Sequence, residues 1–198
     1  MSLDLIITKQ MDEFFKDQID IAIKNQNVKI SELAKLYLVN LLSKNTKENI
    51  VNGDLNQTYG DTPLSIIFHK SLMEPIEQKK IMLKYVGDYS LYVGGFFSES
   101  FNRKIIDLPY YINIGGLAFS NLSKVAGSSE LRSIYKDVCA RFSTLIDILI
   151  EVSFDTNITK VEDLIKSYDR WAQTGSAVLK RKLMEKGIMT VDKKIKVT

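Results

Sequence analysis

The sequence has few of the residues that build metal and redox sites. Its 198 residues include one cysteine, Cys139, and one histidine, His69. A lone cysteine cannot form a disulfide within the chain, which fits a reducing cytoplasm. One histidine excludes a three-histidine zinc site and a ferritin-like di-iron site, which needs a histidine on each of two helices. We therefore expect a cytoplasmic protein without a metal centre. His69 follows apolar residues and is expected to be a partly buried core histidine.

Proline and glycine are also scarce, with three and ten copies, which argues against a loop-rich all-β architecture. The longest uncharged stretch, residues 108–123, is shorter than the roughly 20 residues that cross a bilayer. The N-terminus lacks the basic and apolar pattern of a signal peptide. We expect neither a membrane span nor export. No nucleophile elbow, P-loop or dinucleotide-binding glycine motif is present, so no catalytic residues are assigned.

Apolar residues recur at steps of three and four along most of the chain, as in amphipathic helices. This pattern predicts an all-α fold, a single helical domain of about six to seven helices over residues 1–198. An irregular loop is expected over residues 45–62, where Asn, Gly, Asp and Thr replace the periodic pattern. Residues 188–198 are expected to form a basic tail.

Two serines are suitable N-caps, and each predicts where a helix begins. Ser31 precedes one apolar stripe, and Ser128 precedes a longer one. The second helix is expected to run unbroken to residues 155–157, where Asp-Thr-Asn ends the pattern.

Two apolar, aromatic-rich runs between residues 85 and 120 each contain a Gly-Gly pair. Glycine inside a helix costs about 1 kcal/mol relative to alanine, so these pairs need a structural reason. Small residues at steps of three and four would let two helices approach closely. The pattern predicts a central helical hairpin with small faces at Gly87, Ser90, Gly94 and Ser98 and at Gly116, Ser120 and Ser123.

The tyrosines of the two Gly-Gly runs suggest a ligand pocket at the centre of the domain. Its lining would be Tyr89, Tyr92, Tyr110 and Tyr111, with Asp88 as a polar anchor. A buried carboxylate is costly, which makes Asp88 a candidate for a site. Packing alone is the alternative, with Asp88 facing solvent or bonded to a tyrosine hydroxyl. No particular cofactor follows from these residues.

Charge is concentrated at the C-terminus. The net charge is +3, yet the segment from Lys180 to the end holds seven basic and two acidic residues, so the rest of the chain is close to neutral. A basic tail can attract nucleic acid or an acidic surface, but it is also typical of a solvated helix end. The near-neutral body has no nucleic-acid-binding motif, which disfavours nucleic acid as a partner.

Three segments, YLVNLL (37–42), GDYSLYVGGFFSESF (87–101) and DLPYYINIGGLAFSNL (107–122), resemble a family of bacterial all-helical proteins with no assigned function. The resemblance implies a helical bundle and carries no activity.

A second resemblance involves Tyr85-Val86-Gly87-Asp88, followed by Ser90 and Gly94-Gly95. This run is similar to the glycine-rich, haem-facing helix of haem oxygenases, which implies a bound haem. That family places its haem-ligating histidine near the N-terminus, whereas His69 of this chain lies close before the glycine-rich helix.

Two hypotheses of function follow. The first is a non-catalytic interaction module whose partner is another protein or a second copy of the chain, joined through an aromatic face. The alternative is a helical protein that binds a small molecule or cofactor in the tyrosine pocket. The missing catalytic motifs favour the first hypothesis, and the clustered aromatic residues favour the second.

Overall fold

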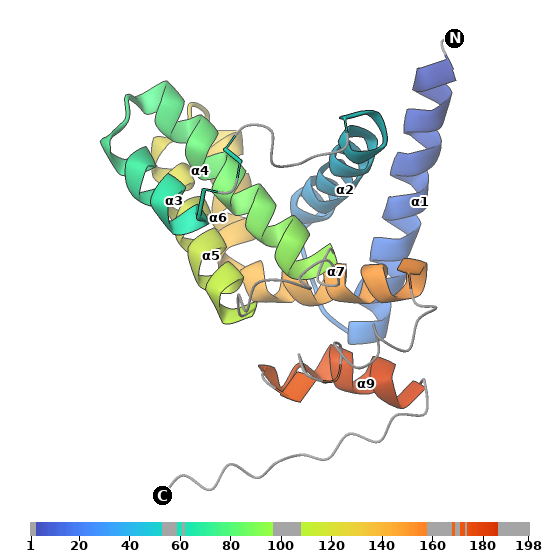
Figure 1. The fold of residues 1–198 in the computed structure, drawn as a ribbon. Coiled ribbons are helices and arrows are strands. Elements are labelled where there is room, and N and C mark those ends of the chain that lie inside the picture. The colour runs from blue at the N-terminus through green and yellow to red at the C-terminus, as the bar shows by residue number, and fades with distance from the viewer. Residues whose placement is uncertain are drawn as a thin grey trace, which may run out of the picture.

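Helices form all the regular structure that could be described. The computed structural model describes residues 3–52, 59–60, 62–96, 108–157, 168, 171–172 and 174–185. Within these ranges there are eight α-helices and one π-helical segment, arranged as in Figure 1. The predicted all-α bundle is confirmed.

The N-terminal part of the chain forms α1 (Leu3–Gln26), α2 (Glu32–Asn52) and α3 (Leu64–Met73). Ser31 caps α2 as predicted, because its Oγ accepts a hydrogen bond of 3.0 Å from the backbone N–H of Ala34. Helix α2 continues to Asn52, so the irregular segment does not begin at residue 45 as predicted. Lys47 and Glu48 in this stretch are good helix formers, which favours a helix where the apolar stripe is lost. Residues 53–58 and 61 lie outside the described residues.

The predicted central pair of helices is present. Helix α4 spans Ile76–Leu91 and continues into the π-helical segment η1 (Tyr92–Phe96), and α5 spans Leu108–Val125. The two pack closely because Gly87 lies against the ring of Phe119, where an added Cβ would come within 2.6 Å of it. The intervening residues 97–107, which include the predicted turn and Ser98, lie outside the described residues.

The small face predicted on α5 is wrong at its glycine, although Ser123 is buried as predicted. Gly115, not Gly116, lies against α4, where an added Cβ would be 2.7 Å from Ser90 Cβ and would overlap the ring of Phe142. Gly116 has open space at the same position. The buried face of α5 follows the larger residues of its stripe, Tyr111, Ile114, Ala118, Phe119 and Leu122, and Gly115 belongs to that stripe.

The Gly-Gly pair of η1 lets the chain pack against α7. An added Cβ on Gly95 would be 2.5 Å from Leu149 Cβ and 3.3 Å from the backbone carbonyl oxygen of Ile146. Ser153 of α7 also donates a 2.6 Å hydrogen bond from its Oγ to the carbonyl oxygen of Phe96. Carbonyl groups in a π-helical turn lose the hydrogen-bond partners that a regular α-helix would give them. The Ser153 hydroxyl supplies such a partner to the carbonyl of Phe96 at the end of the segment.

The long helix predicted after Ser128 is two helices, α6 (Ser129–Ala140) and α7 (Phe142–Asn157). Ser128 caps α6 as predicted, since its Oγ accepts from Leu131 N at 3.2 Å. The break falls at Arg141, whose guanidinium donates to an Asp137 carboxylate oxygen and to the carbonyl of Lys29, both at 2.8 Å. The split explains why the described residues form more α-helices than predicted.

Helix α9 (Ala177–Glu185) docks on α7, which crosses beneath the end of α4 in Figure 1. A solvated helix end was one interpretation of the basic residues here, and for Lys182 it is wrong, because only 7% of its surface is exposed. The burial of Lys182 is explained by Glu151 of α7, which is fully buried and lies 3.7 Å from Lys182 Nζ. Its carboxylate accepts from Arg181 at 2.5 Å and from Asn25 and Gln26 of α1 at 2.8 Å. Residues 188–198 lie outside the described residues.

Candidate functional site

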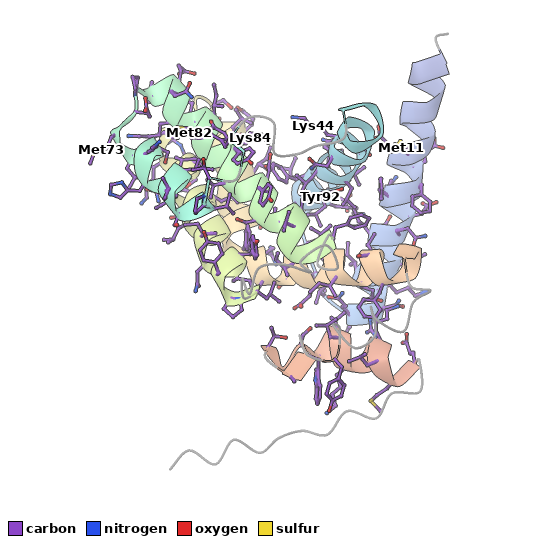
Figure 2. All side chains as sticks on the ribbon, viewed as in Figure 1. Met11, Lys44, Met73, Met82, Lys84 and Tyr92 are labelled. Atoms are coloured by element: carbon purple, nitrogen blue, oxygen red, sulfur yellow. The ribbon has the colours of Figure 1, made fainter. Side chains whose placement is uncertain are left out.

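A cavity of about 620 Å³ lies between α2, α4 and α6. Each helix contributes residues from one face, at steps of three and four. The lining residues are Tyr37, Asn40, Leu41, Lys44 and Asn45 of α2; Ile81, Lys84, Tyr85, Asp88 and Tyr89 of α4; Leu131, Ile134 and Tyr135 of α6; and Tyr59. Lys84 and Lys44 are labelled in Figure 2, on facing sides of α4 and α2.

Tyrosine dominates the wall of this cavity, with five of the nine tyrosines of the chain. Three of them form a continuous row along α4: the ring centroids of Tyr59 and Tyr85 are 4.6 Å apart, and those of Tyr85 and Tyr89 are 5.7 Å apart. Such rings offer flat apolar faces together with hydroxyl groups, which suits a flat ligand with a few polar atoms.

A polar network of three side chains joins α2 to α4 at the cavity wall. Tyr37 donates its hydroxyl proton to Asp88 Oδ1, and the Lys84 ammonium pairs with Asp88 Oδ2. Lys84 Nζ also lies 3.3 Å from the Tyr37 hydroxyl oxygen and 5.3 Å from the centre of its ring. Burial raises the pKa of Tyr37 well above its ordinary value, and the Asp88 charge adds to this effect. Tyr37 is therefore a neutral donor at physiological pH.

Two further polar side chains at the cavity are buried and only partly bonded. Asn45 is 7% exposed, and its amide donates 2.7 Å to the carbonyl of Leu41, which leaves its Oδ1 and second N–H without a partner among the described residues. Tyr135 is 8% exposed, and its hydroxyl makes no hydrogen bond within the described part of the chain. Burial, followed by the Asp88 charge, raises the pKa of Tyr135, so it too stays protonated. Polar groups buried in this way are suited to bind a ligand.

Apolar side chains border the same cavity. Ile81 of α4 is 57% exposed and Leu131 of α6 is 43% exposed, while Ile134 is half-buried beside them. The cavity therefore combines an apolar border, an aromatic wall and a small set of fixed polar groups, as ligand sites commonly do.

The structure brings together two of the five residues predicted for the site. Asp88 and Tyr89 line the cavity. Tyr92 is buried in the core, where its ring stacks on Phe96 at 5.7 Å, and Tyr111 is also buried. Tyr110 lies away from the cavity, and its hydroxyl oxygen accepts from the backbone N–H of Ser65 at 3.0 Å.

Sequence reasoning missed the contributions of α2 and α6. Tyr37 belongs to the apolar stripe that follows Ser31, but Tyr37, Asn40 and Lys44 also repeat at steps of three and four and mix aromatic with polar residues. The same mixture appears at Lys84, Tyr85 and Asp88 on α4. A half-polar helical face of this kind is the signal that could have indicated a site.

The haem implied by the resemblance to haem oxygenases does not fit this site. His69 is exposed on α3 and is not among the residues that line the cavity, which corrects the prediction of a core histidine. The resemblance therefore supplies no haem ligand here. The described ranges hold no group of three or more His, Cys, Asp or Glu side chains placed to bind a metal ion.

Comparisons of the chain with protein-family models, with curated proteins and with solved structures gave no match. In the described residues, no helix has both the length and the apolar character needed to cross a membrane. Function must therefore be inferred from the chain's own residues.

Proposed function

We propose that this chain is a helical ligand-binding protein whose ligand is a small molecule with a flat apolar body. The observation that carries the proposal is the tyrosine-lined cavity between α2, α4 and α6, about 620 Å³ in volume. That size lies within the range of small-molecule sites, roughly 300–1,000 Å³. Asn45 and Tyr135 are mostly buried residues, and their unpaired polar atoms remain accessible from the cavity, where a ligand or water can bond to them.

Titration calorimetry with 2-naphthylacetamide, a neutral two-ring compound, tests the proposal. We expect saturable binding with one site per chain. Tyr85→Leu removes the middle ring of the row formed with Tyr59 and Tyr89, and should weaken binding by about three- to tenfold, since aromatic contacts are worth roughly 0.5–1.5 kcal/mol. Tyr110→Leu makes the same change outside the cavity and should leave the affinity unaltered.

The proposal is wrong if the wild-type protein shows no saturable binding of this compound or of a charged compound with the same two rings, or if Tyr85→Leu and Tyr110→Leu bind it equally well. Circular dichroism of both variants shows whether each retains the helical fold.

A second candidate function, self-association, is favoured by an apolar corner where α3 meets α4. Leu72, Met73 and Ile76 are all exposed there, Met73 by 80%. Clustered exposed apolar side chains are typical of interaction surfaces. Sedimentation velocity over a wide range of concentration would reveal a dimer that Met73→Lys abolishes. A monomer at every concentration would eliminate this candidate.

A further inference from the structure

The polar groups that line the cavity are mostly hydrogen-bond donors. Among the described lining residues Asp88 is the one carboxylate, and each of its oxygens already accepts from the protein, Oδ1 from Tyr37 and Oδ2 from Lys84. A cationic ligand would therefore find the negative charge of this site already compensated. It would also approach the ammonium of Lys84 at close range, which is unfavourable.

Lys84 has a donor to spare. An ammonium group carries three N–H donors, and two of these are directed to Asp88 and to the Tyr37 hydroxyl oxygen. Its side chain is 47% exposed and lies in the cavity wall, so the third donor is open to a ligand. The side chain is held in place by a salt bridge within α4 and by the Tyr37 ring below it.

Tyr135 and Asn45 add two neutral donors. The Tyr135 hydroxyl has no acceptor among the described residues, and Asn45 uses one of its two amide protons on Leu41. Both side chains are more than nine-tenths buried. An acceptor oxygen of a bound ligand would satisfy the Tyr135 hydroxyl proton and the remaining Asn45 N–H without displacing any hydrogen bond that the protein makes.

We propose that the ligand of this cavity is a flat aromatic compound that carries an oxyanion, with the oxyanion accepting from Lys84 and Tyr135 and the ring system packed on the tyrosine row. The inference rests on the proposed function and specifies its ligand class. A carboxylate is the simplest such group, and a charge-assisted hydrogen bond from an ammonium is about twice as strong as a neutral one. Asp88 repels the negative charge of the ligand and Lys84 attracts it. Removing the charge of Asp88 should therefore raise the affinity for the ligand, and removing that of Lys84 should lower it.

Three probes with the same ring system separate the possibilities: 2-naphthylacetate, 2-naphthylacetamide and 2-(2-naphthyl)ethylammonium. For the wild-type protein, calorimetry should show the carboxylate binding about tenfold more tightly than the amide and the ammonium most weakly. The preference for the carboxylate over the amide should decrease as salt is added, because the added attraction is electrostatic.

Two variants test the residues. Lys84→Met keeps the length of the side chain and removes its charge, so the carboxylate should lose its advantage over the amide. Compared with the wild-type protein, Asp88→Asn should bind the carboxylate severalfold more tightly and the ammonium even more weakly. Lys80→Met is the matched control, because Lys80 lies one turn earlier on α4, pairs with Glu77 at 2.6 Å and does not line the cavity.

The outcomes are distinct. If none of the three probes binds, the proposed function itself fails. If the amide binds and the carboxylate is no tighter, or if the ammonium is the tightest, the proposed function stands and the oxyanion inference is overturned. If Lys84→Met does not fold, two other measurements still decide between these results. They are whether Asp88→Asn strengthens or weakens carboxylate binding, and how carboxylate binding by the wild-type protein depends on salt.

Discussion

The adjacent glycines of α5, Gly115 and Gly116, should respond to alanine with opposite signs. An added Cβ at Gly116 meets nothing within 4 Å, whereas at Gly115 it would lie 2.7 Å from Ser90 Cβ and overlap the Phe142 ring. Ser90 belongs to α4 and is fully buried, so it cannot move away without shifting the helix. The same substitution is therefore made at two adjacent positions of one helix, and these positions differ only in the space around the added methyl group.

The expected magnitudes follow from two opposing terms. Replacing glycine by alanine inside a helix gains about 0.5–1 kcal/mol, and Gly116→Ala should show this gain undiminished. Overpacking a filled core costs about 1–3 kcal/mol, so Gly115→Ala should be destabilised on balance by about 1 kcal/mol. The two variants should then differ by about 2 kcal/mol in the free energy of unfolding. For a chain of this size that corresponds to roughly 4–8 °C in Tm.

Urea denaturation followed by circular dichroism measures both free energies, and a thermal scan gives both Tm values. Equal slopes against urea would show that the variants unfold from comparably compact states. If Gly115→Ala were as stable as Gly116→Ala, the close approach of α4 and α5 at this position would be refuted. The opposite order would place the small face at Gly116, as the sequence pattern had predicted.

Two further predictions concern charged side chains, the fully buried Glu151 and the half-buried Asp137. Arg181→Met leaves the fully buried Glu151 with a weaker set of partners and should cost about 2–3 kcal/mol in urea unfolding. This is less than the roughly 3–5 kcal/mol typical of a broken buried pair, because Arg181 is 34% exposed and Lys182 Nζ remains 3.7 Å from the carboxylate. Adding Glu151→Gln should recover part of that loss, and a cost below about 0.5 kcal/mol would contradict the role of the pair. For Asp137, burial raises its pKa, but hydrogen bonds from Ser31 and Arg141 outweigh it and hold the pKa below the ordinary 3.8. Its stabilising contribution is therefore present above about pH 4 and is lost as the pH falls through the folded-state pKa, so Asp137→Asn should flatten stability against pH in that range. Equal slopes for variant and wild type would refute this.

Local sequence signals predicted the parts of the fold that local physics decides. The serines at 31 and 128 cap helices because a hydroxyl before a helix satisfies a free backbone N–H, which depends on a few neighbouring residues. The break at Arg141 was not predictable in this way. No proline or glycine marks it, and its side chain is held by Asp137 in the same helix and by the carbonyl of Lys29, distant in sequence.

The burial of Lys182 was missed for the same kind of reason. The sequence shows a basic run near the C-terminus, and such runs are most often solvated. Its partner Glu151 lies in an apolar stretch of α7, about thirty residues earlier, and further contacts to that carboxylate come from α1 and from Arg181 of α9. Only the tertiary arrangement shows that these charges and amides meet at one buried point.

The candidate site was only half predictable because it depends on which faces of three helices meet. Asp88 and Tyr89 lie in the Gly-Gly segment that drew attention, but Tyr37 and Tyr135 come from α2 and α6. The spacing within each helix fixes that its lining residues share a face. It does not fix which other helix that face meets, and Tyr92 shares the aromatic character of Tyr89 yet lies in the core.

The two faces of α4 explain why a cavity exists beside such tight packing. On one face, Gly87 lets the ring of Phe119 press against the backbone, which draws α5 close. On the other face, the tyrosine row and the Lys84–Asp88 pair are too large for α2 and α6 to approach α4 equally closely. Phe119 connects the two faces, since its ring lies 5.7 Å from Tyr37 and 6.0 Å from Tyr135. The glycine that costs helix stability thus positions the aromatic ring that supports two of the cavity's tyrosines.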